Sequence, residues 1–263
     1  MTALQIDHLH KTYVDGYSGD EVVAIGDVSF AVAEGEFVSV LGPSGCGKTT
    51  VLNIVAGFVE QTAGTVTVAG KPVTGPGPDR GVVFQNHALF PWKTVLGNVT
   101  FGLRMRGVPK AEREATAAEY LRLVGLTGFE HRYPHELSGG MQQRLGVARV
   151  LANEPAVMLM DEPFASIDAQ TRRRLQEDLT RIFQERRPTV FFVTHDVDEA
   201  VFLSDRVVVL TGRPSTVQEI VEVDLPRPRA WRTTGELPRF RALCNRITDL
   251  LVGDEADAVA DPA

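Results

Sequence analysis

A glycine-rich loop near the start of the chain restricts the possible folds more than any other feature. Gly42-Pro-Ser-Gly-Cys-Gly-Lys48-Thr49 matches the pattern G-x-x-x-x-G-K-[ST], with a strand-like run at 37–41 before it and a helix-like run at 49–55 after it. Glycines let the backbone turn its N–H groups inward, and the N-terminus of a helix attracts anions. The motif therefore predicts a phosphate site in which Lys48 supplies a cation and Thr49 a hydroxyl ligand for Mg²⁺. A chance match in a glycine-rich turn is the alternative, and the flanking strand and helix argue against it.

A second short run carries the acidic groups that such a loop needs. Val157-Met-Leu-Met-Asp161-Glu162 predicts an apolar strand that ends in two carboxylates. We expect Asp161 to complete the Mg²⁺ shell and Glu162 to polarise water for in-line attack on a phosphate. Two solvated acids after a strand are common in isolation, so this interpretation depends on the pairing with the upstream loop.

Short apolar runs separated by helix-like segments indicate an α/β chain. Continuous apolar runs of this kind suit strands buried on both faces of a parallel sheet. Between about 94 and 153 the strand signals thin out and helical spacing takes over, as at 111–124, where charges lie on one face and apolar residues on the other. We therefore predict an α/β core interrupted by a mostly helical insert. Strands are expected at 22–25, 28–32, 37–41, 66–68, 81–84, 156–160, 189–194 and 206–210.

Composition excludes several classes of protein. Of the 263 residues 43% are hydrophobic and 23% charged, which excludes general disorder. A net charge of −7 argues against a protein that wraps nucleic acid, because such proteins favour a basic face. The two cysteines, Cys46 and Cys244, lie far apart and predict no disulfide framework. The start lacks the pattern of a secretory signal, and no apolar run approaches about 20 residues, so we expect a cytosolic chain that does not itself cross a membrane.

Leu137-Ser-Gly-Gly-Met141 resembles the LSGGQ signature of ATP-binding cassette (ABC) proteins. It stands in the order typical of that family, which is phosphate loop, glutamine loop at Gln85, signature, acidic strand, Ser166-Ile-Asp168 turn and His195 switch. Met141 replaces the usual glutamine, and Ser166-Ile167-Asp168 replaces the commoner Ser-Ala-Leu-Asp pattern. Neither change removes a group with a known chemical role.

The resemblance covers residues 4–229 and implies a fold. The expected class is α/β, with a P-loop NTPase (RecA-like) core, an N-terminal antiparallel β subdomain and a helical insert that bears the signature. The ABC ATPase domain is expected at 1–229, with the helical subdomain at about 87–155. A short helical extension at 230–252 and a disordered acidic tail at 253–263 are expected to follow.

The resemblance also implies roles for residues around the nucleotide. Glu162 is the general base, His195 contacts the γ-phosphate, and Gln85 senses Mg²⁺ and the attacking water while hinging the insert. Tyr13 is expected to stack on adenine, with Tyr17 as a rival ring able to do the same. ATP contacts are expected from Tyr13, Gly42, Pro43, Ser44, Gly45, Cys46, Gly47, Lys48, Thr49, Thr50, Ser138, Gly139, Gly140 and Asp168, and Mg²⁺ ligands from Thr49, Gln85 and Asp161. The thiol of Cys46 is expected to be sensitive to alkylation if it faces the nucleotide.

The signature itself has a physical interpretation. Ser138 followed by two glycines at the start of an apolar-periodic helix makes an N-cap with exposed N–H groups, which is a second anion site away from Lys48. An ordinary capped helix would explain Ser138 alone, but not its place between Gln85 and Asp161. In the family, two subunits pack head to tail, and each signature closes on the ATP held by the other subunit's phosphate loop. Asp168 resembles the turn aspartate that communicates across that dimer.

Within the family the chain most resembles the nitrate, sulfonate and taurine importer group, on residues 83–92, 132–138 and 224–229. This implies a peripheral ATPase subunit at the cytoplasmic face of the inner membrane. Its expected partners are a second copy, integral permease subunits and, indirectly, a secreted solute-binding protein, with no nucleic acid. An exporter ATPase with the same motifs and a soluble non-transport ATPase are the alternatives. The solute stays open, because this subunit never touches it.

Two further stretches each have two interpretations. Ala88-Leu-Phe-Pro-Trp92 is expected to line the groove that receives a permease's coupling helix, with core packing of the insert as the alternative. Basic residues between Arg104 and Arg113 indicate a solvated face, or a contact to anionic headgroups or to a permease loop.

Overall fold

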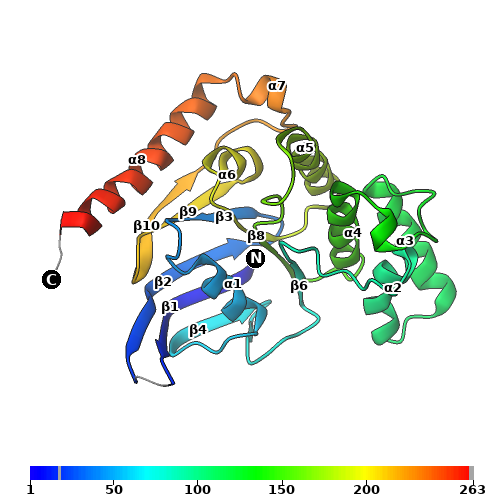
Figure 1. Ribbon diagram of the computed structural model, residues 1–263, viewed down its shortest axis with the longest axis horizontal. Coiled ribbons are helices and arrows are strands. Elements are labelled where there is room, and N and C mark those ends of the chain that lie inside the picture. The colour runs from blue at the N-terminus through cyan, green and yellow to red at the C-terminus, as the bar shows by residue number, and fades with distance from the viewer. Residues whose placement is uncertain (17–18, 261–263) are drawn as a thin grey trace.

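The computed structural model describes residues 1–16 and 19–260, which fold around a ten-stranded sheet (Figure 1). Its strand order is β5-β4-β1-β2-β10-β9-β3-β8-β7-β6. Tyr17 lies outside the described residues, so both Tyr13 and Tyr17 stay candidates for stacking on adenine. The strands are β1 (Thr2–Val14), β2 (Glu21–Ala33), β3 (Phe37–Leu41), β4 (Ala63–Val68), β5 (Lys71–Pro72), β6 (Arg80–Val83), β7 (Val157–Asp161), β8 (Val190–Val193), β9 (Arg206–Leu210) and β10 (Ser215–Glu222).

One half of this sheet is parallel, as the continuous apolar runs predict. Strand β3 pairs in parallel with β8 and β9, and β7 pairs in parallel with β6 and β8. All residues of β3 and β8 are buried, because the sheet is covered on both faces. The carboxyl ends of these five strands meet at one edge, which gathers the loops that follow them.

The other half is mostly antiparallel. Strand β1 pairs antiparallel with β2 and β4, and β4 with β5. Strand β10 joins the halves, running parallel to β2 and antiparallel to β9. The predicted strands at 22–25 and 28–32 are one strand, β2. The sequence did not reveal β1 or β10, because register shifts interrupt the alternation in both, and His8 within β1 has a positive φ of 47°.

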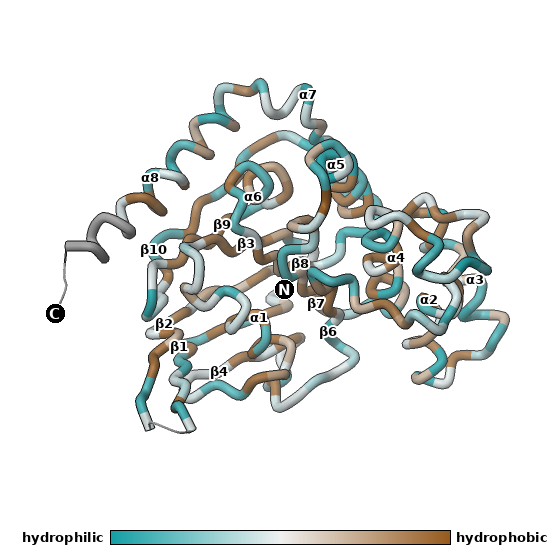
Figure 2. The backbone as a smooth tube through the Cα atoms, viewed as in Figure 1, coloured by the Kyte–Doolittle hydropathy of each residue, from teal (hydrophilic) through white to brown (hydrophobic). Residues whose placement is uncertain are grey.

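Helices cover the two faces of the curled sheet. Helix α1 packs among buried residues of β1, β2 and β4 on one face, and α4, α5, α6 and α8 pack on the other. In Figure 2 the hydrophobic colour gathers on the central strands, while the outer helices alternate between hydrophobic and hydrophilic colours. The helices are α1 (Lys48–Ala56), α2 (Val95–Met105), α3 (Lys110–Leu123), the 3₁₀ turn η1 (Pro134–Glu136), α4 (Gly139–Leu151), α5 (Ala169–Arg186), α6 (Val197–Leu203), α7 (Trp231–Thr234) and α8 (Pro238–Ala260).

The predicted helical insert lies between β6 and β7. Helices α2, α3 and α4 pack on one another and form the green group at one side of Figure 1, next to α5. The α/β class with a parallel core, an antiparallel β layer and a helical insert is confirmed. None of the helices in the described part of the chain is long and apolar enough to cross a membrane.

The acidic tail differs from its prediction. We expected a helix that ends at Val252 and disorder from 253 onward, but α8 runs to Ala260, and residues 261–263 lie outside the described residues. Residues 254–260 contain three alanines and neither glycine nor proline. Alanine has the highest helix propensity, so this short acidic stretch can extend a helix that is already formed.

Candidate functional site

The phosphate loop connects β3 to α1, and two of its glycines have backbone angles that other residues rarely adopt. The φ values are 76° at Gly45 and 109° at Gly47, and a Cβ on Gly47 would lie 3.2 Å from the carbonyl oxygen of Ala24. Gly47 is the N-cap of α1 and supplies no side-chain cap. The first N–H groups of α1 therefore have no side-chain acceptor, which is the arrangement that binds a phosphate.

Lys48 and Cys46 fix the shape of this loop from inside. Lys48 is 7% exposed, and its ammonium donates to the carbonyl oxygens of Gly42 and Pro43 at 2.7 and 2.9 Å. A Cβ on Gly42 would lie 2.7 Å from the Cys46 sulfur, so the thiol packs directly beneath the loop. Burial raises the pKa of Cys46, although Lys48 partly opposes this. A buried, protonated thiol is inert, so the structure does not favour an alkylation-sensitive Cys46.

Thr49 and Asp161 meet across the edge of the sheet. The Thr49 hydroxyl donates to Oδ1 of Asp161 at 3.2 Å, over 112 positions of sequence. Burial raises the pKa of Asp161, and the bond from Thr49 partly offsets this. A hydroxyl and a carboxylate are the hard oxygen ligands that Mg²⁺ prefers, so these two residues fit the ion. Among the side chains that the structure describes, no three from His, Cys, Asp or Glu form a metal site, so phosphate oxygens and water would have to complete the shell.

Glu162 and His195 form a second pair at the same edge. Glu162 follows β7 with a φ of 42°, a conformation that costs a non-glycine residue of order 1–3 kcal/mol. Its N–H donates to the Val193 carbonyl at 2.9 Å, which holds this turn against β8. Oε2 of Glu162 lies 3.0 Å from Nδ1 of His195, the residue two positions beyond β8. The strained turn thus points a carboxylate at an imidazole beside the phosphate loop.

Thr49, Glu162 and His195 line a pocket of about 430 Å³ beside the phosphate loop, and Asp161 lies just outside its lining, bonded to Thr49. Arg213 lines it too, and its guanidinium donates to the Gly45 carbonyl at 2.9 Å. Sequence reasoning missed Arg213. No local pattern marks Arg213, because it reaches the pocket through the pairing of β9 with β3, whose carboxyl end leads into the phosphate loop. The lining residues are Ser44, Gly45, Gly47, Lys48, Thr49, Thr50, Glu162, His195 and Arg213.

Two more of the predicted residues lie farther from the pocket than Asp161 does. Among the residues that the structure describes, Gln85 and Tyr13 are outside the pocket lining. Gln85 is exposed, and it follows β6, whose Val83 is in register with Met160 one strand away. The Tyr13 ring is 42% exposed on β1, with the Lys11 ammonium 4.9 Å from its centroid.

The signature lies at the start of α4. The Ser138 hydroxyl accepts the N–H of Met141 at 3.4 Å, and Gly139 is exposed. A Cβ on Gly140 would lie 2.9 Å from Thr171, so the signature packs closely against the first turn of α5. Asp168 caps that turn by accepting the Thr171 N–H at 3.0 Å, and these N–H groups lower the pKa of Asp168. Among the described residues, none of the three signature positions 138–140 lines the pocket at the phosphate loop.

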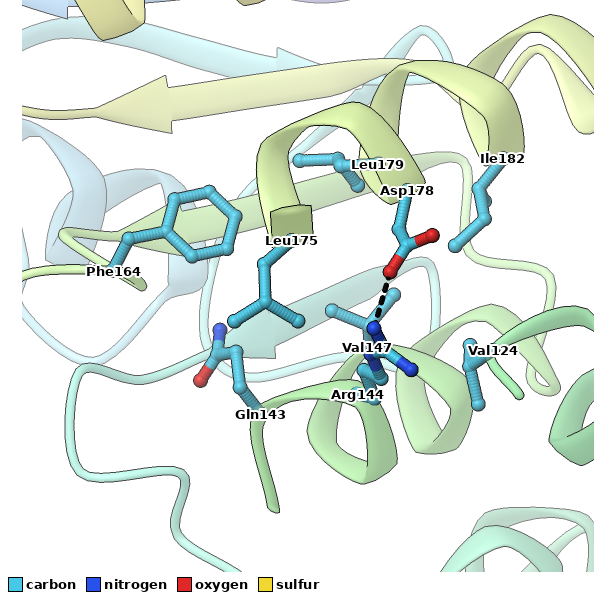
Figure 3. A pocket seen from close by; sticks show the side chains of 9 residues that line it. All are labelled: Val124, Gln143, Arg144, Val147, Phe164, Leu175, Asp178, Leu179 and Ile182. Carbon is cyan, nitrogen blue, oxygen red and sulfur yellow. Dashed lines mark hydrogen bonds and ion pairs between the residues drawn. The ribbon is translucent and has the colours of Figure 1, made fainter. Parts of the chain in front are cut away.

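An ion pair joins the signature helix to the core. Arg144 on α4 and Asp178 on α5 are 2.6 Å apart, beside a small cavity of about 20 Å³ with apolar walls. Figure 3 shows α5 side chains facing the α4 side chains across this seam, with Asp178 reaching down to Arg144. The apolar residues around it are Val124, Val147, Phe164, Leu175, Leu179 and Ile182.

Comparisons with known proteins agree with this geometry. Residues 25–165 match the ABC transporter family. The chain is 56% identical over 238 residues to an uncharacterized ABC transporter ATP-binding protein of Methanocaldococcus jannaschii, covering 90% of this chain and 88% of the relative. It is 50% identical over 208 residues to the taurine import ATP-binding protein TauB of Pseudomonas putida, covering 79% of each. It is 45% identical over 266 residues to the nitrate import ATP-binding protein NrtD of Synechocystis sp., covering 98% and 99%.

A solved structure gives the same fold. The dimeric post-hydrolysis state of the ATP-binding cassette MJ0796, bound to ADP and Pi, matches 85% of this chain and 100% of its own, with a TM-score of 0.72 and 31% identity. Together with the phosphate loop, the acidic strand and the signature, these matches identify the chain as an ATP-binding cassette ATPase that belongs to the ABC transporter family.

Proposed function

We propose that this chain is the ATP-hydrolysing subunit of an importer that takes up a small anionic or sulfur- or nitrogen-containing solute, of the nitrate, sulfonate or taurine type. The observation that carries the proposal is the meeting of three elements around one pocket. The phosphate loop, the Thr49–Asp161 pair and the Glu162–His195 pair come from segments far apart in the sequence, and each supplies a group that ATP hydrolysis needs.

The phosphate loop binds the nucleotide. Its N–H groups and the Lys48 ammonium face the β- and γ-phosphates, and Arg213 adds a second cation at the rim of the pocket. Thr49 and Asp161 would hold Mg²⁺, with Gln85 joining the shell when the insert moves inward. The ion neutralises charge on the β- and γ-phosphate oxygens when bound. Tyr13 stacks on the adenine.

Glu162 performs the chemistry. Its carboxylate orients a water molecule in line with the γ-phosphate and accepts a proton from it. His195 holds the γ-phosphate and, through the 3.0 Å contact, the orientation of the Glu162 carboxylate. General base catalysis of this kind contributes about 10²–10⁴-fold to the rate.

A second copy of the chain completes each site. The N–H groups at the start of α4, where Ser138 and Gly139 are exposed, face no phosphate loop of their own chain, so they close on the nucleotide that the other copy holds. Asp168 bonds to Thr171, and Thr171 lies close to Gly140 of the signature. A movement of Asp168 at one nucleotide site would therefore also move the signature that closes on the other.

An apolar groove between the core and the insert suits a permease helix. It has a volume of about 760 Å³, and Phe58, Trp92 and Met105 near it are 50%, 71% and 62% exposed. Large apolar patches on a surface of this kind mark binding sites for another protein. Exposure of Trp92 favours the docking interpretation of residues 88–92 over core packing. Apolar residues that line the groove are Phe58, Val82, Phe84, Phe90, Phe101 and Met105.

The proposed setting is the cytoplasmic face of the inner membrane, where the chain binds permease subunits that receive solute from a secreted solute-binding protein. The taurine and nitrate import relatives support this solute class. The test is purification of the tagged chain from gently solubilised native membranes, with all co-purifying chains identified. We expect a permease, with a solute-binding protein recovered or encoded beside it, whose thermal unfolding midpoint rises with nitrate, taurine or an alkanesulfonate. A permease with no such binding protein would indicate export, and recovery of only soluble chains would overturn the transport role.

A further inference from the structure

The segment that follows β10 clamps the C-terminal end of α6. Arg229 is 3% exposed, and its guanidinium donates to the carbonyl oxygens of Val201, Phe202 and Ser204 at 2.8–3.3 Å. Burial lowers the pKa of Arg229 to about 10, so it remains a cation at neutral pH. A cation among the last carbonyls of a helix satisfies acceptors that the helix itself leaves unpaired, and it complements the helix dipole.

Arg227 reinforces the same contact from the same segment. Its guanidinium donates to the Leu203 carbonyl at 2.9 Å and to Asp205 at 2.8 Å, and it lies 4.6 Å from the ring centroid of Phe183 on α5. The two arginines therefore tie the segment to α6 and α5 together. Figure 1 shows this segment and α7 passing over α6 and α5 on the outer side of the sheet.

Trp231 then extends the clamp between these two helices. Its ring stacks on Phe202 of α6 with the centroids 4.1 Å apart and the planes at 6°. The indole N–H donates to Oε1 of Gln176 on α5 at 2.8 Å, and the backbone N–H donates to Glu177 at 2.8 Å. The indole therefore has a defined polar partner as well as an apolar one.

A chain of buried hydrogen bonds leads from Trp231 to the residue before His195. The Gln176 amide donates to Oε1 of Glu199 at 2.7 Å, and the Thr194 hydroxyl donates to Oε2 of the same carboxyl group at 2.5 Å. The three side chains are only 2–4% exposed. Thr194 also accepts the N–H of Asp196, so its hydroxyl holds the backbone on both sides of His195.

This chain of bonds ends against the catalytic pair. A cavity of about 30 Å³, large enough for a water molecule, lies between Glu199 and Thr194 on one side and Glu162 and His195 on the other. A clamp that only stabilised the fold would not need the buried carboxyl group of Glu199 and amide of Gln176. Apolar side chains could fill the same space without the cost of desolvating polar groups. These hydrogen bonds therefore connect the C-terminal segment, without a break, to the loop that carries His195.

We infer that residues 225–231 form a clamp that sets the position of His195 through the chain Trp231–Gln176–Glu199–Thr194. Trp231, Gln176 and Glu199 are positioning residues, since none of them lines the pocket at the phosphate loop within the described part of the protein. The inference depends on the proposed role of His195 at the γ-phosphate. Residues 225–231 would then contribute to ATP hydrolysis as well as to the stability of the fold.

The test compares Trp231→Phe, His195→Ala and the double variant in the full chain. Trp231→Phe keeps a ring on Phe202 and removes the N–H that bonds Gln176. We expect kcat for ATP hydrolysis to fall about tenfold, since small displacements of catalytic groups cost up to about 10²-fold, while the KM for ATP and the thermal midpoint stay near wild type. In the His195→Ala background, the same change should have no further effect on kcat, because the clamp acts through His195.

Two further variants keep the test decisive. Gln176→Met removes the amide, keeps a side chain of similar length, and should repeat the loss in kcat. Arg239→Gln breaks an exposed ion pair with Asp224 in the same C-terminal region and should leave kcat unchanged. Folded Trp231→Phe and Gln176→Met proteins with wild-type kcat, or losses that add to that of His195→Ala, would overturn the inference. Wild-type hydrolysis by His195→Ala would instead remove the proposed role of His195 itself.

Discussion

The two helix N-termini that carry glycine motifs differ in what surrounds them. At α1, the loop contains a buried lysine, and Thr49, Glu162 and His195 line one pocket, with Asp161 bonded to Thr49. At α4, Ser138 caps an exposed turn. Among the described residues, none of 138–140 lines that pocket. One terminus is thus a nearly complete nucleotide site, and the other supplies only an anion-binding cap.

This difference is the basis of the proposal that two copies of the chain are needed for hydrolysis. The cap at α4 has the chemistry to bind a phosphate but has no phosphate loop beside it in its own chain. Helix α4 stands apart from α1 in Figure 1, on the side of the insert that faces α5. In the proposed function, pairing of two copies brings each cap to the other copy's nucleotide, and the matched solved structure of an ATP-binding cassette is likewise a dimer.

The largest expected effect comes from removing the base at the α1 site. Glu162→Gln keeps the size of the side chain and its place beside His195, but it cannot accept a proton from water. We expect kcat for ATP hydrolysis to fall by about 10²–10⁴-fold with little change in ATP affinity. Steady-state phosphate release and equilibrium nucleotide binding measure the two quantities, and a wild-type rate would show that another group is the base.

A substitution at the start of α4 should lower kcat nearly as much as Glu162→Gln does, while it leaves the residues of the α1 site unchanged. A Cβ on Gly139 meets no atom within 4 Å, so Gly139→Asp should fold normally while placing a negative charge at the anion site. Removal of one such donor site costs about 10²–10³-fold, so we expect a fall in kcat of that size. ATP binding to the single chain should be unchanged, and Gly139→Ala is the control for size. Weakened ATP binding to the single chain would place the signature within its own site.

The buried carboxyl group behind the α1 site should give stability a pH dependence. Burial raises the pKa of Glu199 to about 7, with Asp196 adding to this and Thr194, Gln176 and Arg172 opposing it. The folded state therefore holds a proton that the unfolded state loses between about pH 4.5 and 7, so stability falls as pH rises through this window. Relative to Glu199→Gln, the wild type should lose about 2 to 3 kcal/mol from pH 4.5 to 8 in denaturant titrations. Parallel pH curves for the two proteins would show that Glu199 does not titrate there.

The smallest expected effect concerns the seam between the insert and the core. Arg144→Met removes a partly exposed ion pair with Asp178, which also contacts Arg181, and keeps the apolar stem. We expect a loss of about 1 kcal/mol in the free energy of unfolding and only a minor change in ATP affinity. A large fall in ATP affinity, measured by nucleotide titration, would mean that the insert shapes the α1 site as well.

The α1 site could be predicted from sequence because local patterns determine it. A parallel strand buried on both faces is a continuous apolar run, and the groups that follow such strands gather at one edge. This is why Asp161 and Glu162, far from Lys48 in the chain, could be placed with it, whereas the role of His195 was predicted from the family resemblance. The helix at 111–124 was predicted for a similar reason, since its apolar positions repeat at helical spacing and α3 runs over Lys110–Leu123.

Features that depend on distant pairing could not be predicted. Arg213 enters the pocket only because β9 pairs with β3, and no local pattern marks that pairing. Gln176 and Glu199 lie among charged residues on α5 and α6, so both resemble solvated surface positions in the sequence. Their burial follows from the packing of Trp231 and α6 against α5. The bulged strand β1 was missed because irregular register disrupts its alternation.

The most direct test of the two-copy site is the mass of the Glu162→Gln protein in solution with and without Mg²⁺-ATP. By sedimentation equilibrium, we expect a species of 28.7 kDa without nucleotide and a species of twice that mass at saturating ATP. Adding Gly139→Asp to the same protein should abolish the doubling while ATP still binds. A Glu162→Gln protein that remains at 28.7 kDa with ATP bound would contradict the account, since the signature would then have no second nucleotide on which to close.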